Sequence, residues 1–195
     1  MKVKRAVFLD RDGVLNRNVS NVSTGAYESP RKPEEFELYP NIMPALRSLQ
    51  NEGFVLFLVS NQPNYAKGKS TLEELHAIHS CLVAALKAAQ VSFADYYYCF
   101  HHPHGKVPSY SGICECRKPS PYFLLKARDE FGISLSDSWM VGDRATDIEC
   151  GIAAGVRTIR VEEDHPATRA ASEPKADHEV RDLACCADII INAGE

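Results

Sequence analysis

Apolar and polar positions follow two patterns that alternate along the chain. Short apolar runs, typical of strands buried on both faces of a parallel sheet, occur at 5–10, 53–61, 94–100, 138–143 and 156–161. Apolar residues at helical spacing lie between them, at 43–53, 70–90, 121–133 and 145–155. Strands that alternate with helices predict an α/β fold, with a mostly parallel, doubly wound sheet in three layers.

Residues that favour helix ends support these boundaries. The second predicted helix can open with either of two capping boxes, Ser70 with Glu73 or Thr71 with Glu74. Ser120 is the expected N-cap of the third helix, because a serine hydroxyl can accept a hydrogen bond from a free backbone N–H of the first turn.

Two segments carry neither pattern. Residues 16–40 are rich in Asn, Ser, Pro and charged residues. A segment of this length is long for a plain connection and short for a domain. Residues 163–178 are polar and contain proline, which predicts a surface loop. The stretch at 177–191 that follows is expected to add one more strand or helix.

Composition limits the class of protein. The 195 residues fit a single domain at 1–195, because domains commonly run about 100 to 200 residues. A net charge of −4 gives no basic footprint for nucleic acid. No run approaches the roughly 18 apolar residues of a membrane helix, and the N-terminus lacks the apolar stretch of a signal peptide. We therefore expect a cytoplasmic protein with no membrane or nucleic-acid partner.

Seven cysteines are an odd number for a disulfide framework. In a reducing compartment, clustered cysteines are more often metal ligands or small buried side chains. Cys81 and Cys150 fall in helical patterns and are expected in the core.

In open α/β folds, ligands bind beyond the carboxyl ends of the strands. Four polar motifs of this chain lie at predicted strand ends. They are DRDG at 10–13, SNQ at 60–62, RKP at 117–119 and GDRATD at 142–147. Several carboxylates in one cleft require a cation, and oxygen ligands with open positions suit Mg²⁺. A hydroxyl, amides and a lysine supply the donors that a phosphoryl group needs.

Each motif has an ordinary structural interpretation when taken alone. An aspartate at a strand end can be a helix N-cap or a loop acid, Ser-Asn a turn, and Arg-Lys a solvated pair. Four such motifs in this order, each at a predicted strand end, favour a phosphate site instead.

These motifs resemble those of the haloacid dehalogenase (HAD) superfamily of phosphohydrolases. "FLDRDGVLN" is similar to the first family motif, Ser60 to the second, Lys118 to the third and "VGDRATD" to the fourth, so that the resemblance covers roughly 5–161. It implies a Rossmann-like HAD fold. No large inserted segment follows the first or second motif, so we expect no large cap domain.

The resemblance also implies roles. Asp10 would be the nucleophile that forms an aspartyl-phosphate, and Asp12 the general acid and base. Mg²⁺ would bind the Asp10 side chain, the Asp12 backbone carbonyl and Asp143. Ser60 and Lys118 would stabilise the transferring phosphoryl group.

Two residues of the fourth motif receive further roles from the resemblance. Arg144, directly after the metal-binding acid, would contact substrate. Asp147, one helical turn further on, would support the metal ligands without binding the ion.

The stretch at 99–116 has the composition of a zinc site. Cys99, His101, Cys114 and Cys116 supply three thiolates and one imidazole, a set that makes closed tetrahedral zinc sites with no open position, which are structural. The alternatives are free thiols with loop histidines, or a site that uses His102 or His104. A bound zinc would order this loop and fix the backbone just before Arg117 and Lys118.

The combination of DRDG, SNQ, this loop and CRKP resembles one HAD subgroup, the D-glycero-D-manno-heptose-1,7-bisphosphate 7-phosphatases and the related histidinol-phosphatases. The long gap between the two ligand pairs is closer to the heptose enzymes. The subgroup pattern favours His101 as the ligand, implies substrate recognition by Arg117, and has Asn61, Gln62 and Pro63 line the phosphate end. The expected substrate is a small phosphorylated metabolite, most simply that heptose bisphosphate, with histidinol phosphate or another sugar phosphate as the alternative.

Two departures concern substrate. Pro63 and Asn64 stand where these phosphatases usually have Ser-Gly, and the 16–40 segment does not match their substrate loop. Arg31 and Lys32 in that segment are either a solvated pair or contacts for a second phosphate.

Two other classes compete with a phosphatase. A receiver-like regulatory module is also phosphorylated on an aspartate. It does not need a second acid, such as Asp12, to protonate a leaving group. A zinc-ribbon interaction protein would explain 99–116 and leave DRDG and GDRATD without a role. We therefore expect a Mg²⁺-dependent phosphomonoesterase with a structural zinc, acting as a monomer or weak oligomer.

Overall fold

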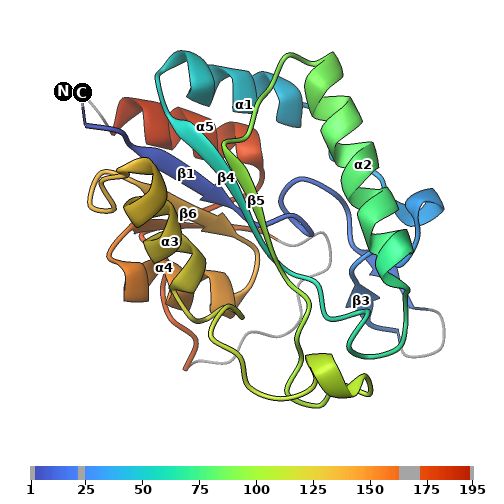
Figure 1. The fold of residues 1–195 in the computed structure, drawn as a ribbon. Helices are drawn as coiled ribbons and strands as arrows, with labels where there is room; N and C mark the ends of the chain where they lie inside the picture. The colour runs from blue at the N-terminus through green and yellow to red at the C-terminus, as the bar shows by residue number, and fades with distance from the viewer. Residues whose placement is uncertain (1–2, 22–24, 163–171, 194–195) are drawn as a thin grey trace.

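A six-stranded, fully parallel sheet forms the centre of the protein, with helices on both faces (Figure 1). The structure is a computed structural model that describes residues 3–21, 25–162 and 172–193. The strand order is β5-β4-β1-β6-β7-β8. The strands are β1 (Ala6–Leu9), β4 (Val55–Asn61), β5 (Asp95–Cys99), β6 (Trp139–Gly142), β7 (Arg157–Val161) and β8 (His178–Val180).

Five α-helices connect and cover the strands. They are α1 (Ile42–Asn51), α2 (Leu72–Ala88), α3 (Tyr122–Phe131), α4 (Ala145–Ala154) and α5 (Leu183–Asn192). All five strands and four helices expected from the sequence are confirmed. The last stretch, for which a strand or a helix was expected, forms both β8 and α5. Of the expected loop at 163–178, residues 163–171 lie outside the described part of the chain.

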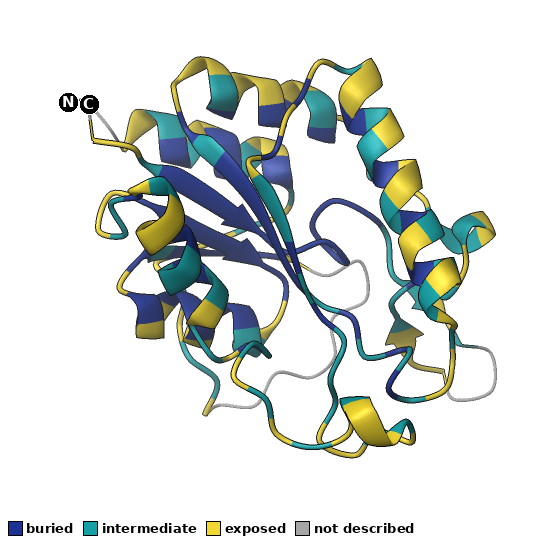
Figure 2. Cartoon of the chain, viewed as in Figure 1, coloured by how far each residue is buried: buried dark blue, intermediate teal, exposed yellow. Residues whose placement is uncertain are grey.

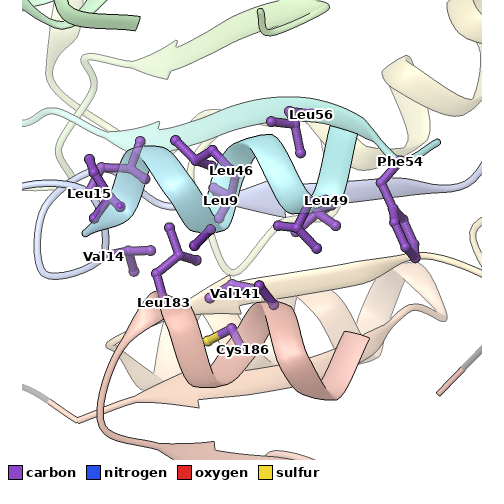
Figure 3. Close-up of a cluster of buried hydrophobic side chains, with 14 of the residues drawn as sticks. Leu9, Val14, Leu15, Leu46, Leu49, Phe54, Leu56, Val141, Leu183 and Cys186 are labelled. Atoms are coloured by element: carbon purple, nitrogen blue, oxygen red, sulfur yellow. The ribbon is translucent and has the colours of Figure 1, made fainter. Parts of the chain in front are cut away.

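The core lies in two layers because successive strand residues point to opposite faces of a sheet. Val7 and Leu9 of β1 belong to the cluster under α1 and α5, whereas Ala6 and Phe8 belong to the cluster under α3 and α4. Figure 3 shows the first cluster, in which side chains from α1 and α5 meet those from the strands between them. Both faces of β1 are therefore apolar, as the unbroken run indicated. The doubly wound, three-layer arrangement follows directly.

The burial of the chain follows the same logic in Figure 2, where the strands are mostly buried and the helices expose one side. Helix α2 shows this best, because its buried residues Leu75, Ile78, Leu82 and Leu86 form one stripe. Cys81 lies beside the stripe and is exposed. Its expected place in the core is wrong because one helical position rotates a side chain by about 100°. Cys150 is buried in α4, as expected.

The segment at 16–40 forms small elements rather than a domain. It contains a two-stranded antiparallel ribbon of β2 (Val19–Ser20) and β3 (Tyr27–Glu28), followed by a 3₁₀ turn, η1 (Pro33–Glu35). Another 3₁₀ turn, η2 (Pro108–Tyr110), lies in the 99–116 loop. Within the described ranges no large cap covers the carboxyl ends of the strands. No helix among these residues is both long and apolar enough to cross a bilayer.

The N-terminal ends of α3 and α2 refine two expectations from the sequence. Helix α3 begins one residue later than expected, with Pro121 at the N-cap position, although the Ser120 hydroxyl still accepts a hydrogen bond from the Tyr122 N–H at 3.3 Å. At α2 the capping box is Thr71 with Glu74: the Thr71 hydroxyl accepts from the Glu74 N–H at 3.1 Å, and the Glu74 carboxylate accepts from the Thr71 N–H at 2.7 Å.

We expect Thr71→Ala to lower the free energy of unfolding by about 1 kcal/mol, because it removes the N-cap of the longest helix. Ser70→Ala is the matched control. The Ser70 hydroxyl is buried without a hydrogen-bond partner, so its loss should change stability by less than about 0.5 kcal/mol. Urea unfolding of both variants measures the difference, and equal effects would contradict this assignment of the cap.

Candidate active site

Three adjacent strands of the sheet deliver acids or a hydroxyl to one place. β1 leads into Asp10, β4 ends near Ser60 and β6 leads into Asp143, and all three residues are buried. The Asp10 N–H donates to the carbonyl of Val141 at 2.9 Å, which keeps the end of β1 in register with β6. The strand ends therefore bring together residues that are far apart in sequence.

Lys118 lies among these acids and is almost completely buried. Its ammonium is 3.0 Å from an Asp10 oxygen and 2.7 Å from an Asp147 oxygen, and it donates to the carbonyl of Val59 at 2.6 Å. Burial alone lowers the pKa of a lysine, but the two carboxylates outweigh it and hold the pKa of Lys118 above its ordinary value. Lys118 therefore remains charged in the site.

Asp10 has the opposite balance. Burial raises its pKa, Lys118 lowers it, and the nearby carboxylates Asp147 and Asp12 raise it again, with a net upward direction. A divalent cation beside Asp10 would favour the carboxylate form that a nucleophile needs.

The acids fit a hard divalent ion. Oxygens of Asp10, Asp143 and Asp147 lie within 4.8 Å of one another and all three residues are buried. Asp147 already accepts from Lys118 with one oxygen and from the Arg144 N–H with the other, at 3.0 Å. Its carboxylate is thus committed to the protein, which leaves Asp10 and Asp143 as the acids with room for Mg²⁺ and agrees with the supporting role expected for Asp147.

Gly13 shows how tightly the backbone of the first motif packs here. Its φ is +85°, and a Cβ at this position would lie 2.1 Å from an Asp143 oxygen. Only glycine adopts this conformation and leaves that space without strain. The loop after β1 can therefore lie directly against the acid that follows β6.

The carboxylate of Asp12 is held by the side chains of Arg11, Asn16 and Gln62, and a hydrogen bond with the Ser29 side chain also lowers its pKa. Arg11 donates from Nε and Nη2 to one Asp12 oxygen at 3.0 and 2.9 Å, and from Nη2 to the other at 3.2 Å. Asn16 donates at 2.9 Å and Gln62 at 2.6 Å. Burial raises the pKa of Asp12, but the Arg11 charge and the hydrogen bonds outweigh it and lower the pKa.

Arg11 and Asn16 are site residues that the sequence analysis missed. Both are buried, at 1% and 0% exposure. The signal for Arg11 was present, because a charge directly after a buried strand and between two acids needs a partner inside the protein. Asn16 carried no comparable signal.

The amide of Asn61 holds the backbone of Lys118 from both sides. Asn61 Nδ2 donates to the Lys118 carbonyl and the Lys118 N–H donates to Asn61 Oδ1, each at 3.1 Å. Asn61 was expected to bind substrate; it lines the cavity, but both ends of its amide are used to place Lys118.

A cavity of about 410 Å³ lies above the acids. Asp10, Asp12, Pro63 and Lys118 line it, with Arg117 and Arg144 at its wall, so most of the residues expected in the site meet there. Further lining comes from the 16–40 segment and the turn after β4, namely Ala26, Tyr27, Glu28, Ser29, Asn64, Lys67 and Lys69. Of the expected site residues, Ser60, Gln62 and Asp143 are not among those that line it, and their roles stay predictions.

Away from Lys118 and the acids at the strand ends, the charged residues that line the cavity are four cations, Lys67, Lys69, Arg117 and Arg144, and one acid, Glu28. Lys69 pairs with Glu28 at 2.7 Å, Arg117 donates to the carbonyl of His101 at 3.1 Å, and Arg144 is 3.8 Å from an Asp143 oxygen. Lys67 is half-buried, and burial together with the charges of Lys69 and Arg117 lowers its pKa. An anion is the natural ligand for such a wall.

The two departures from the subgroup pattern, Pro63–Asn64 and the 16–40 segment, contact each other. Asn64 is buried and donates from its amide to the carbonyl of Ser29 at 3.2 Å, so the turn after β4 holds the 16–40 segment against the cavity. Arg31 in that segment pairs with Glu35 at 2.9 Å and is not in the cavity lining, as expected for a solvated pair.

The four expected zinc ligands lie together. Ligand atoms of Cys99, His101, Cys114 and Cys116 are all within 4.8 Å of one another, whereas His102 and His104 are not part of the group. The Sγ atoms of Cys99 and Cys114 are 3.5 Å apart and those of Cys114 and Cys116 are 3.7 Å apart. A tetrahedron with Zn–S bonds of 2.3 Å has edges of about 3.8 Å, so this spacing fits zinc and is too wide for a disulfide.

The loop that carries this cluster is joined to the cavity wall. The Lys106 and Val107 N–H groups both donate to the carbonyl of Ala66, at 2.6 and 3.1 Å, and the rings of Tyr65 and Tyr110 meet edge to face. The cluster therefore fixes the turn at 63–69 as well as Arg117, which directly follows Cys116 in the chain.

Comparisons with known proteins show the family of this chain. A family model described as HAD-hydrolase-like matches residues 115–186. The D-glycero-beta-D-manno-heptose-1,7-bisphosphate 7-phosphatase of Escherichia coli K12 is 36% identical over 180 residues, which cover 92% of this chain and 90% of that protein. The D-glycero-alpha-D-manno-heptose-1,7-bisphosphate 7-phosphatase of Photorhabdus laumondii is 34% identical over 166 residues, which cover 85% of this chain and 86% of that protein.

A solved structure has the same fold. The D,D-heptose 1,7-bisphosphate phosphatase from B. bronchiseptica, complexed with magnesium and phosphate, superposes with a TM-score of 0.77 at 24% identity, covering 97% of this chain and 99% of that one.

We expect Cys116→Ser to weaken the metal cluster, because it removes one of three thiolates. Zinc content measured by atomic absorption should fall below one per chain, and the melting temperature should drop. Cys185→Ser is the control, because that cysteine lies outside the cluster. Full zinc occupancy in the Cys116 variant, or no zinc in wild-type protein purified without chelator, would contradict this assignment.

Proposed function

Because the chain belongs to the heptose-1,7-bisphosphate 7-phosphatase family of HAD phosphatases, we propose that it removes the 7-phosphate of D-glycero-D-manno-heptose 1,7-bisphosphate. The observation that carries this proposal is the arrangement beside the cavity: the Asp10 carboxylate and the Lys118 ammonium, 3.0 Å apart, line it, and a carboxylate oxygen of Asp143 lies within 4.8 Å of Asp10. We propose further that residues 1–195 act as one catalytic domain.

In the first half of the reaction an Asp10 oxygen attacks phosphorus, and the bond from phosphorus to the sugar oxygen breaks. Although Arg11 lowers the pKa of Asp12, this step proceeds from the protonated form: Asp12 gives its proton to that leaving oxygen, so the sugar departs as an alcohol. In the second half, water attacks phosphorus and gives a proton to Asp12, and the bond to Asp10 breaks. Phosphate is released, and both acids return to their starting states.

Lys118 and Ser60 stabilise the charge on the phosphoryl oxygens as it passes between the two acceptors. Asp10 and Asp143, with the backbone carbonyl of Asp12, would hold Mg²⁺, which when bound neutralises charge on the phosphate. Asp147 keeps Lys118 in place through their ion pair of 2.7 Å.

The zinc ligands Cys99, His101, Cys114 and Cys116 would hold a structural ion, because four protein ligands leave no position for substrate. All seven cysteines are free thiols, which supports a reducing compartment and the cytoplasm as the proposed location. The monomeric or weakly oligomeric state stays a prediction.

The positive wall favours a substrate with a second anion. Lys67, Arg117 and Arg144 line the cavity beside the phosphate end, and they suit a bisphosphate better than histidinol phosphate, which carries an ammonium group. Histidinol phosphatase remains the second candidate on the subgroup resemblance alone.

We expect Asp10→Asn to abolish Mg²⁺-dependent phosphate release, because an amide oxygen is a poor nucleophile. Circular dichroism should show an unchanged fold. Phosphate release at the wild-type rate by this variant would contradict the nucleophile assignment.

We expect a higher kcat/KM for the heptose bisphosphate than for histidinol phosphate.

Lys67→Ala should raise KM for the bisphosphate about tenfold and leave KM for a sugar monophosphate nearly unchanged, because a charge-assisted hydrogen bond contributes about 1.5 kcal/mol. Lys32→Ala is the control, since Lys32 is exposed and not in the cavity lining. A larger effect from Lys32 than from Lys67 would place the second phosphate elsewhere.

A further inference from the structure

We propose that Arg11 and Gln62 are positioning residues that hold the carboxylate of Asp12 in the orientation needed for both of its proton transfers. This inference rests on the proposed aspartyl-phosphate mechanism, in which Asp12 first protonates the leaving sugar oxygen and then accepts a proton from the attacking water. It assigns a function to the second residue of the DRDG motif.

The contacts form a closed network around Asp12. Arg11 binds both Asp12 oxygens, at 2.9 and 3.2 Å from Nη2, and the same Nη2 donates to Gln62 Oε1 at 2.8 Å. Gln62 Nε2 donates to Asp12 at 2.6 Å and to the Ser60 hydroxyl at 3.0 Å. Every polar atom of the Gln62 side chain is therefore used to connect Asp12, Arg11 and the phosphate-binding strand end.

Neither residue is placed to touch substrate. Asp12 lines the main cavity, but Arg11 and Gln62 do not. They line a smaller cavity of about 200 Å³ on the α2 side, together with Leu75, His76, His79, Tyr96, Tyr98 and Phe100. Arg11 and Gln62 thus lie behind the acid. Arg11 acts on the reaction through Asp12, and Gln62 acts through Asp12 and through the Ser60 hydroxyl.

Arg11 is itself held in place. Its guanidinium lies 6.0 Å from the centre of the Tyr98 ring, and the Tyr98 hydroxyl is 3.0 Å from His79 Nδ1. β5 and α2 therefore support Arg11 from the side opposite Asp12. A planar guanidinium with several contacts fixes the rotation of a carboxylate, which an ammonium as a point charge cannot do.

Stability alone is a weak reason for this pair. Burying an arginine and a carboxylate costs desolvation that the ion pair rarely more than offsets, so apolar residues of the same size would stabilise the fold as well. A general acid, in contrast, depends on its orientation toward the transferred proton. The network provides that orientation.

The test compares Arg11→Lys with the wild type on two esters, a sugar phosphate and p-nitrophenyl phosphate. Nitrophenolate leaves without protonation, so the first step with this ester does not need Asp12 as an acid. The second step needs Asp12 as a base with either ester. We expect kcat for the sugar phosphate to fall about tenfold or more with little change in KM, since general acid–base catalysis is worth about 10² to 10⁴.

With p-nitrophenyl phosphate the Arg11→Lys variant should give a burst of about one nitrophenol per active site, followed by slow turnover, because the phosphoenzyme forms normally and hydrolyses slowly. Asp12→Asn should show the same pattern more strongly. The double variant should be no slower than Asp12→Asn alone, because a residue that acts through Asp12 has no effect once that carboxylate is lost.

Gln62→Leu repeats the test with Arg11 intact and covers the case in which Arg11→Lys does not fold. Arg160→Lys is the matched control: it removes another buried arginine that pairs with a carboxylate, Glu173 at 2.7 Å, and should leave the burst absent. Equal losses on both esters without a burst, or multiplicative losses in the double variant, would overturn the positioning role. A wild-type protein that releases no phosphate from any ester would instead refute the proposed function.

Discussion

The buried contact of Lys118 with Asp10 and Asp147 is the interaction on which the rest of the site depends. The Lys118 ammonium lies within 3.0 Å of both carboxylates, all three residues are buried, and none of these charges is tolerable alone at that depth. Lys118 neutralises part of the acid cluster and keeps its positive charge at the edge of the cavity. The residual negative charge of Asp10 and Asp143 explains why a divalent ion suits the same place.

Much of the surrounding structure serves to place this lysine. Asn61 binds its backbone from both sides, and Asp147 binds its side chain while also accepting from the Arg144 N–H at the N-cap of α4. The zinc-type cluster ends at Cys116, two residues earlier, so the loop enters the site from a fixed point. A cluster that has no open position for substrate can therefore still matter for activity.

The wall of the cavity is built by segments that are not part of the sheet. Asn64 joins the turn after β4 to the 16–40 segment, and Ala66 joins it to the loop of the cysteine cluster. The unusual Pro63–Asn64 pair thus belongs to a joint between three loops, all of which line or support the cavity. We propose that substrate choice is set there and the chemistry at the strand ends.

The amino-acid sequence determined the strands, the helices and the chemical identity of the site. Apolar runs such as 5–10 must be buried on both faces, and acids at the ends of parallel strands must converge, because parallel strands share one carboxyl edge. Tertiary structure decided which side chain each site residue contacts. Nothing in the local pattern distinguishes Gln62, which faces Arg11 and Asp12, from Asn61, which binds Lys118, or shows that Cys81 lies outside the core. Such contacts join residues some 50 positions apart, so their geometry exists only after the sheet and its loops have packed.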